Sequence, residues 1–194
     1  MKFSGLLLIL IFLCSGKTLF ANKSPHSIIE QLKEIDANVI FMRHALAPGF
    51  GDPENFNLDS CETQRNLNVD GRQQAIDSGH YLRNESLKFD AIYSSQWCRC
   101  LETAKLLNFS IEESFAGLNS FFQGHAPRKE TLDLLKTKMS QLDGSTLSLM
   151  VTHQVVISAV TGITVSSGKM VAYNTHTGKS ILLDLNIKFN SYKH

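Results

Sequence analysis

The chain alternates between short runs that are apolar throughout and longer segments in which apolar residues recur every three or four positions. The first kind of run is typical of strands buried on both faces, and it covers residues 38–42, 90–94, 147–152 and 180–185. The second kind predicts helices over residues 97–107, 129–142 and 155–161, and a further helix that opens at Asp70. Strands that alternate with helices indicate an α/β fold with a parallel sheet covered on both faces. Such a sheet binds its ligand beyond the carboxyl ends of its strands.

The first 21 residues differ in pattern from the rest of the chain. Lys2 precedes an unbroken apolar run over residues 6–13, and small or polar residues lead from there to Ala21. This layout is that of a secretory signal peptide, and the apolar run is too short to span a bilayer. We therefore expect a signal peptide over residues 1–21, a single domain over residues 22–194, a periplasmic or secreted location, and no stable membrane insertion after cleavage. An uncleaved signal anchor is the alternative.

The charge balance argues against nucleic acid as a partner. The 194 residues include 19 Lys+Arg and 18 Asp+Glu. Residues 1–21 hold two lysines and no acid, so the remaining chain has a net charge of −1 with its histidines neutral, and it has no basic tract. Any concentration of positive charge must therefore be local, as it is at a binding site.

Three cysteines follow the signal peptide, namely Cys61, Cys98 and Cys100. In an oxidising compartment this number predicts one disulfide and one remaining thiol. A metal site built from all three is the alternative. Positions 98 and 100 are two residues apart on a predicted helix and face different directions, so we expect no metal.

Cationic residues follow three of the predicted strands. Arg43 and His44 end the first strand, Arg99 comes shortly after the second, and His153 ends the third. A guanidinium group matches the oxygens of a phosphoryl group, and imidazole can act as ligand, acid or nucleophile. A histidine among arginines is kept neutral, and a neutral imidazole is a competent covalent nucleophile. The pattern therefore indicates phosphoryl chemistry.

With these residues in place, the sequence resembles the histidine phosphatase superfamily, the phosphoglycerate mutase-like proteins. Four segments carry the resemblance in the family's order: FMRHA, RNLNVDGRQQA, IYSSQWCRCLETA and LMVTHQ. The resemblance implies a three-layer α/β/α fold with a mixed, mainly parallel central sheet. It also implies that His44 is the nucleophile, that Arg43, Arg99 and His153 hold the phosphoryl oxygens, and that no cofactor is needed. Ala45 departs from the family pattern, because glycine is usual there.

The proton donor is the second departure from the family. One branch places a glutamate where this chain has Ser120, and the other places an aspartate directly after the second histidine, where this chain has Gln154. Without either acid, the enzyme is expected to favour good leaving groups. Alternatively, the donor comes from the long loop after His44, which contains four acidic candidates: Asp52, Glu54, Asp59 and Glu62.

The same loop contains Cys61, while Cys98 precedes the phosphate-binding Arg99 of the resemblance. A Cys61–Cys98 disulfide would pin the loop over the phosphate pocket. Pairing with Cys100 is the alternative, which is less favoured because Cys100 replaces a small residue that should pack inward. Arg65, near the end of the loop, is a weak candidate for a further phosphate contact.

These observations support an exported phosphatase that acts through a phosphohistidine intermediate on a phosphomonoester, such as a sugar phosphate or an envelope glycan phosphate. A phosphatase restricted to good leaving groups, such as phosphohistidine, is one alternative. A non-catalytic phosphoanion-binding module is another, although binding alone would not need both His44 and His153. A mutase is the least favoured hypothesis, because an exported protein has little access to the phosphorylated metabolites that mutases use.

Overall fold

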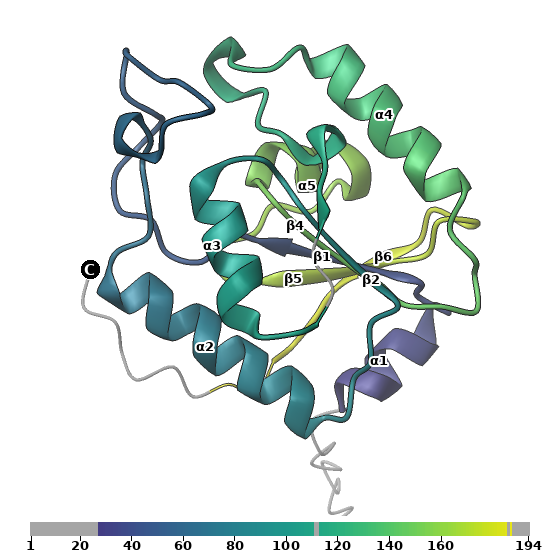
Figure 1. The fold of residues 1–194 in the computed structure, drawn as a ribbon. Coiled ribbons are helices and arrows are strands. Elements are labelled where there is room, and N and C mark those ends of the chain that lie inside the picture. Colours follow the sequence, from purple (N-terminus) through teal and green to yellow (C-terminus); the bar gives the residue numbers. More distant parts are fainter. Residues whose placement is uncertain (1–26, 111–112, 186, 188–194) are drawn as a thin grey trace, which may run out of the picture.

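A single six-stranded sheet organises the protein (Figure 1). The computed structural model describes residues 27–110, 113–185 and 187, so the expected signal peptide lies outside the described residues. The strand order is β3-β2-β4-β1-β5-β6. The strands are β1 (Val39–Arg43), β2 (Ala91–Ser94), β3 (Glu113–Ser114), β4 (Ser148–Thr152), β5 (Met170–Tyr173) and β6 (Ser180–Leu182).

The sheet is mixed and mainly parallel. β4 pairs in parallel with both β1 and β2, and β2 pairs in parallel with β3. β5 runs antiparallel to both β1 and β6. The strands that the apolar runs predict, β1, β2, β4 and β6, all run in one direction, as expected, whereas β5, which no run predicts, is antiparallel. The mixed, mainly parallel sheet implied by the family resemblance is confirmed. The reason is local: β5 and β6 are joined by a short turn in which the Asn174 amide bonds the Lys179 carbonyl, and a hairpin must be antiparallel.

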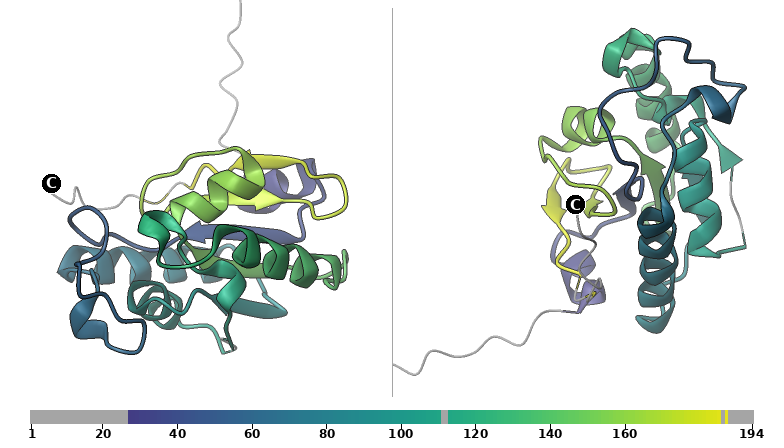
Figure 2. Two further views of the ribbon diagram at one scale, coloured as in Figure 1. Left: turned by 90° about the horizontal axis from the view of Figure 1, so that it is seen from above. Right: turned by 90° about the vertical axis from the view of Figure 1, so that its left-hand side faces the viewer.

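Helices cover both faces of this sheet (Figures 1 and 2). The helices are α1 (Ile28–Glu34), α2 (Val69–Asn84), α3 (Cys98–Leu107), α4 (Arg128–Ser140) and α5 (Gln154–Thr161). Ile40 and Met42 of β1 pack in one apolar cluster with α1, α2 and α3. Val39 and Phe41 pack in a second cluster with α4 and α5. Successive β1 residues thus point into opposite layers, and the three-layer α/β/α fold is confirmed.

Three elements, α1, β3 and β5, do not follow from the apolar pattern. The seven-residue α1 is too short to show a clear helical period, and it begins with a reciprocal capping box between Ser27 and Glu30. β3 has two exposed residues, and its pairing with β2 defines it. The strand expected over 180–185 ends at Leu182. No helix in the described part of the chain is long and apolar enough to cross a membrane.

Helix α2 packs very closely against the segment that follows β1. A Cβ atom on Gly71 would overlap the carbonyl of Leu46, and one on Gly79 would overlap the carbonyl of Leu107 at the end of α3. Both contacts are possible only because glycine has no side chain. Gly71 thereby fixes the path of the chain two residues after His44.

Candidate active site

The carboxyl ends of β1, β2 and β4 meet at one edge of the sheet, as the strand pattern predicts. Arg43 is in register with Thr152, and the His44 amide donates to the Thr152 carbonyl at 2.9 Å. The structure brings Arg43, His44, Arg99 and His153 together in the lining of one pocket of about 230 Å³. The candidate catalytic and phosphate-binding residues therefore converge on one place.

The tautomer of His44 follows from its hydrogen bond. Its ring Nδ1 lies 2.7 Å from the carbonyl oxygen of Ala45, which can only accept, so Nδ1 carries the proton. Nε2 is left with its lone pair. Burial, followed by the charge of Arg99, lowers the pKa of His44 well below its ordinary value. His44 is thus a neutral imidazole with Nε2 as a nucleophile.

Ala45 replaces the family glycine without strain. It is not among the described residues with positive φ, so its backbone conformation does not require glycine. Its methyl group is fully buried, and its amide donates to Thr103 Oγ1 at 3.0 Å. The substitution keeps the carbonyl that holds His44.

Arg43 and Arg99 each donate hydrogen bonds to other protein groups through their terminal nitrogens. Arg43 Nη1 donates to Gln154 Oε1 at 3.1 Å and to the Val165 carbonyl at 2.8 Å. Arg99 donates from Nη1 and Nη2 to the two carboxylate oxygens of Asp52, at 2.7 and 3.1 Å. The Nε atom of each arginine is buried and has no hydrogen-bond partner. These two Nε donors are thus closed off from solvent as well as unpaired, and a buried donor without an acceptor is costly.

His153 is oriented by a chain of polar side chains from β2 and the loop before α4. Its Nε2 lies 2.9 Å from Ser95 Oγ, and Ser95 donates in turn to Asn119 Oδ1 at 3.2 Å. Because the Ser95 proton is directed to Asn119, Nε2 of His153 donates to Ser95. Nδ1 then faces Arg99 Nη2 at 3.4 Å. Burial, and after it the charge of Arg99, lowers the pKa of His153 well below its ordinary value.

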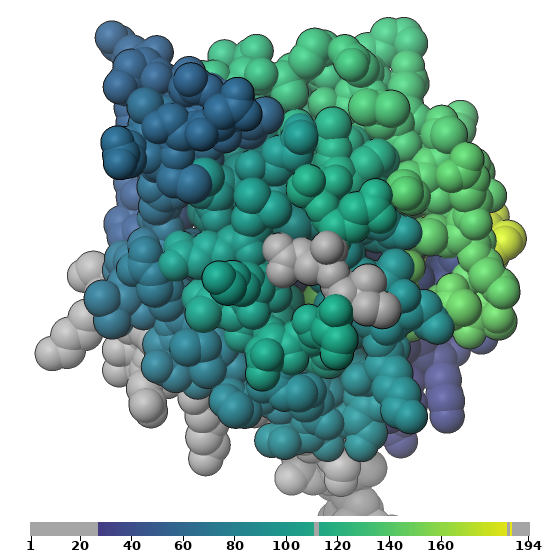
Figure 3. All heavy atoms as spheres, viewed as in Figure 1, coloured from purple at the N-terminus to yellow at the C-terminus, as the bar shows by residue number. Residues whose placement is uncertain are grey.

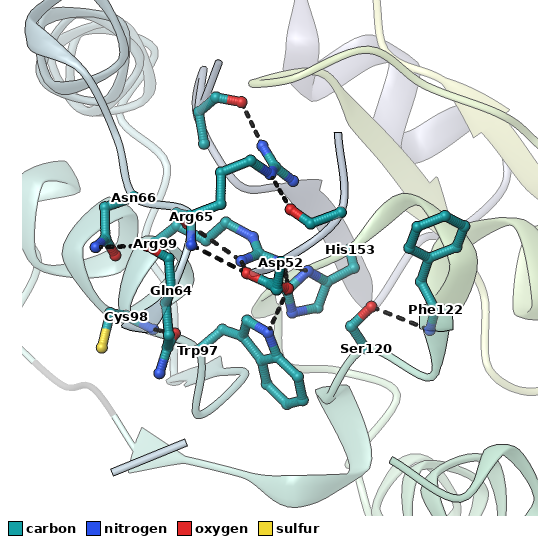
Figure 4. A network of polar contacts seen from close by, with 12 residues as sticks. Asp52, Gln64, Arg65, Asn66, Trp97, Cys98, Arg99, Ser120, Phe122 and His153 are labelled. Carbon is teal, nitrogen blue, oxygen red and sulfur yellow. Dashed lines mark hydrogen bonds and ion pairs between the residues drawn. The ribbon is translucent and has the colours of Figure 1, made fainter. Parts of the chain in front are cut away.

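Among the acids of the loop after β1, only Asp52 lines the pocket. Figure 4 shows its contacts with Arg99 and Trp97. Burial alone would raise the pKa of the Asp52 carboxyl, but the hydrogen bonds and charge of Arg99 outweigh it and lower this pKa below its usual value. Asp52 is therefore ionised and has no proton to donate. The other acidic candidates are exposed and do not line the pocket: Glu54, Asp59 and Glu62. The structure does not support the expectation that this loop supplies the proton donor.

Ser120 and Gln154 both line the pocket, at the positions where the two family branches place their acid. Ser120 is buried, and its Oγ accepts a hydrogen bond from the Phe122 amide at 3.3 Å. Gln154 bonds Arg43. Neither side chain is a strong acid, so the pocket lining contains no carboxylic acid other than the ionised Asp52.

A disulfide between Cys61 and Cys98 ties the loop after β1 to the start of α3, as expected. It excludes a metal site built from the three cysteines, because two of the thiols are consumed. Cys100 is buried, and burial raises the pKa of its thiol to about 12. In the space-filling view, the loop after β1 and the segment before α4 form one end of the molecule (Figure 3). They are joined there by a 2.8 Å hydrogen bond from the Asp52 amide to Gln123 Oε1.

The pocket includes Phe50, which the sequence did not indicate, and Arg65, which was a weak candidate for a phosphate contact. Phe50 is 89% exposed, and its ring meets that of Phe122 edge-on at 5.2 Å, with both residues in the pocket lining. Arg65 also lines the pocket, but its Nε and Nη1 donate to the carbonyls of Gly51 and Ala47 within the loop. The loop's length was a sequence signal for a pocket cover. No local pattern indicates which of its side chains turn inward.

Comparisons with known proteins agree with this geometry. The family model described as Histidine phosphatase superfamily (branch 1) matches residues 39–116. No curated protein matches the chain.

Three solved structures illustrate the likeness of fold. The protein histidine phosphatase SixA complexed with tungstate is 14% identical, with a TM-score of 0.53 over 75% of this chain and 94% of that chain. A putative alpha-ribazole-5'-P phosphatase from Escherichia coli is 17% identical, with a TM-score of 0.55 over 76% of this chain and 96% of that one. A mycobacterial glucosyl-3-phosphoglycerate phosphatase is 13% identical, with a TM-score of 0.53 over 75% and 96%. At these identities the likeness shows the fold.

Proposed function

From the match of residues 39–116 to the histidine phosphatase superfamily (branch 1), we propose that the protein is a phosphatase that hydrolyses a phosphomonoester through a phosphohistidine intermediate on His44. The observation that carries the proposal is one arrangement: a neutral His44 with its Nε2 lone pair free lines one pocket with three arginines, Arg43, Arg65 and Arg99, whose guanidinium groups are hydrogen-bond donors. Phosphoryl oxygens are acceptors of the right charge for these donors.

The chemistry requires only groups that the pocket holds. His44 Nε2 attacks phosphorus, so that a P–N bond forms while the ester P–O bond breaks and its electron pair leaves with the oxygen. Arg43 and Arg99 neutralise the charge on the phosphoryl oxygens during this transfer, while the neutral His153 lies in the pocket lining beside Arg99. Water then attacks the phosphohistidine, the P–N bond returns its electron pair to Nε2, and inorganic phosphate is released.

The leaving group receives little help in this pocket. Ser120 and Gln154 replace the usual acids, and Asp52 is an ionised partner of Arg99. General acid catalysis typically contributes about 10²–10⁴-fold to a rate. The proposal therefore favours leaving groups that depart without a proton, such as a phenolate or an imidazole, over a simple alkoxide.

We propose further that the protein acts outside the cytoplasm. The Cys61–Cys98 disulfide is of the kind that persists in oxidising compartments, and the sequence of residues 1–21 has the pattern of a signal peptide. A sugar phosphate or an envelope glycan phosphate is the substrate class that such a location would offer, and without a proton donor these alkyl esters would react more slowly than an aryl phosphate. A partner among nucleic acids remains disfavoured by the charge balance.

The test compares the oxidised wild-type protein with His44→Ala on an aryl phosphate and on an alkyl sugar phosphate. We expect the wild type to hydrolyse the aryl phosphate at least about 10²-fold faster than the variant, since removal of a nucleophile removes the covalent route. Brief reaction with a ³²P-labelled aryl phosphate should leave acid-labile label on the wild type and none on His44→Ala.

Equal rates for the two proteins would sink the phosphatase proposal. In that case the arginines that line the pocket would favour the second candidate function, a phosphoanion-binding module without turnover. Thermal stabilisation by inorganic phosphate in both proteins would then identify it.

A further inference from the structure

The carboxylate of Asp52 accepts four hydrogen bonds in the pocket. Its two carboxylate oxygens accept from Nη1 and Nη2 of Arg99, at 2.7 and 3.1 Å. They also accept from the backbone amide of Arg65 at 3.1 Å and from the indole Nε1 of Trp97 at 3.1 Å. The side chains of Asp52 and Arg99 are only 4% and 3% exposed. Figure 4 shows Asp52 at the centre of this network.

The network occupies both terminal nitrogens of Arg99 and leaves its buried Nε unpaired. Its terminal nitrogens are occupied, since Nη1 donates to Asp52 and to the Arg65 carbonyl, and Nη2 donates to Asp52 and faces His153. Its Nε has no partner. Because Arg99 lines the pocket, its guanidinium would meet a substrate there while Asp52 holds its terminal nitrogens.

Two interpretations of this contact are possible. Asp52 could occupy the place of the phosphoryl group and leave when substrate arrives, or it could stay and hold Arg99 in position. Four hydrogen bonds and burial argue that it stays, because a displaced Asp52 would leave the Trp97 and Arg65 donors unpaired. The covalent bond from Cys61 to Cys98, next to Trp97 and Arg99, also holds the loop near α3.

We propose that Asp52 is a positioning residue, which fixes the guanidinium of Arg99 in the pocket lining, where the phosphoryl group would bind. The inference rests on the proposed function, since it assigns Arg99 to the substrate. Asp52 pre-orders a long side chain that would otherwise lose rotamer freedom on binding. It also adjusts the charge of the pocket: against three arginines, Arg43, Arg65 and Arg99, one carboxylate leaves a net charge of +2, which matches a phosphomonoester dianion.

The central variant is Asp52→Asn, which preserves shape and removes the charge. Its amide would place N–H donors against other donors, so Arg99 should lose its fixed orientation. We expect kcat/KM for an aryl phosphate to fall about 10²-fold, with a loss in kcat as well as a rise in KM, as for a misplaced catalytic group. The matched control is Asp133→Asn on the exposed face of α4, which removes an exposed ion pair with Lys129 and should leave kcat/KM unchanged.

A double-mutant cycle separates positioning from a general structural role. In an Arg99→Lys background the bidentate contact is already lost, so adding Asp52→Asn should change kcat/KM by less than about threefold. A merely structural Asp52 would instead give the same factor in both backgrounds, and that result would overturn the inference. If Asp52→Asn does not fold, Trp97→Phe removes one donor to Asp52 and should give a smaller loss that likewise vanishes with Arg99→Lys.

A measurement of inorganic phosphate binding tests this inference separately from the proposed function. Trp97 is the one tryptophan of the chain and bonds Asp52, so its fluorescence reports on the site. We expect Asp52→Asn to bind phosphate about 10-fold more weakly than wild type. Tighter binding by the variant would mean that Asp52 occupies the phosphate position, and the inference fails. Lack of turnover in the wild type refutes the phosphatase proposal alone, whereas lack of phosphate binding refutes both.

Discussion

At the scale of single residues, the pocket combines a complete set of groups for accepting a phosphoryl group with an incomplete set for releasing an alcohol. His44 and the two arginines suit the first step of the proposed reaction, because the imidazole is neutral and the guanidinium groups line the same pocket. Neither Ser120 nor Gln154 is a strong acid that could protonate the leaving oxygen. Placing an acidic side chain in the pocket tests whether the lack of a proton donor limits the reaction.

We predict that Ser120→Glu increases hydrolysis of an alkyl phosphate. The glutamate would line the pocket where one family branch carries its acid, and a bound phosphate dianion would offset the arginine charges and raise the pKa of the new carboxyl. We expect kcat/KM for an alkyl phosphate to rise at least about 10-fold, within the range of general acid catalysis, while an aryl phosphate with a good leaving group changes little.

The control for this prediction is Ser120→Ala, which removes the hydroxyl without adding an acid and should not raise the alkyl rate. An unchanged ratio of alkyl to aryl rates in Ser120→Glu would show that the missing acid does not limit the reaction. Steady-state rates over a series of leaving groups give the ratio directly.

At the scale of elements, the strand-end pattern located the site, whereas contacts between distant segments completed it. Arg43, His44 and His153 could be placed from the sequence because parallel strands bring their carboxyl ends to one edge. The ionic contact between Asp52 and Arg99 spans 47 residues and depends on the path of a loop that has no periodic pattern. The strand β5 was missed because its four apolar residues form a short run whose pairing, antiparallel to β1, is a property of the sheet.

The disulfide is the element-scale device that limits the freedom of this loop. Cys61 and Cys98 are separated by 37 residues. In the chain-entropy account, a crosslink of this span stabilises the folded state by about 3–4 kcal/mol. We predict that the double variant Cys61→Ala/Cys98→Ala loses roughly this free energy of unfolding, measured by urea denaturation, and that its phosphatase activity falls because Asp52 no longer holds Arg99.

Reduction of the wild type should reproduce both effects, and the same reductant should leave the double variant unchanged. A double variant that is less stable but fully active would contradict the link between the loop and Arg99. It would leave the disulfide as a purely stabilising crosslink.

At the scale of the whole molecule, the buried histidines of the site lower the free energy of unfolding in acid. His44 and His153 are both buried, with exposed fractions of 2% and 3%, and the pKa of each is lowered well below its ordinary value in the folded state. Above about pH 6.5 both histidines are neutral in the folded and unfolded chains. Below that pH the unfolded chain takes up protons that the folded chain cannot, so stability is lost as the pH falls toward the folded-state pKa.

Each histidine can contribute a slope of up to about 1.4 kcal/mol per pH unit over this window. We therefore predict that the free energy of unfolding falls by roughly 2 kcal/mol between pH 6 and pH 5, as measured by urea denaturation. Asp52 does not contribute in this window: its pKa is lowered below the usual carboxyl value, so the stability it adds is present above about pH 4 and is lost only in stronger acid. His44→Gln removes one of the two groups and should halve the slope, while an unchanged slope would mean that His44 is protonated as readily in the folded protein as in the unfolded chain, contrary to its assignment as a neutral nucleophile.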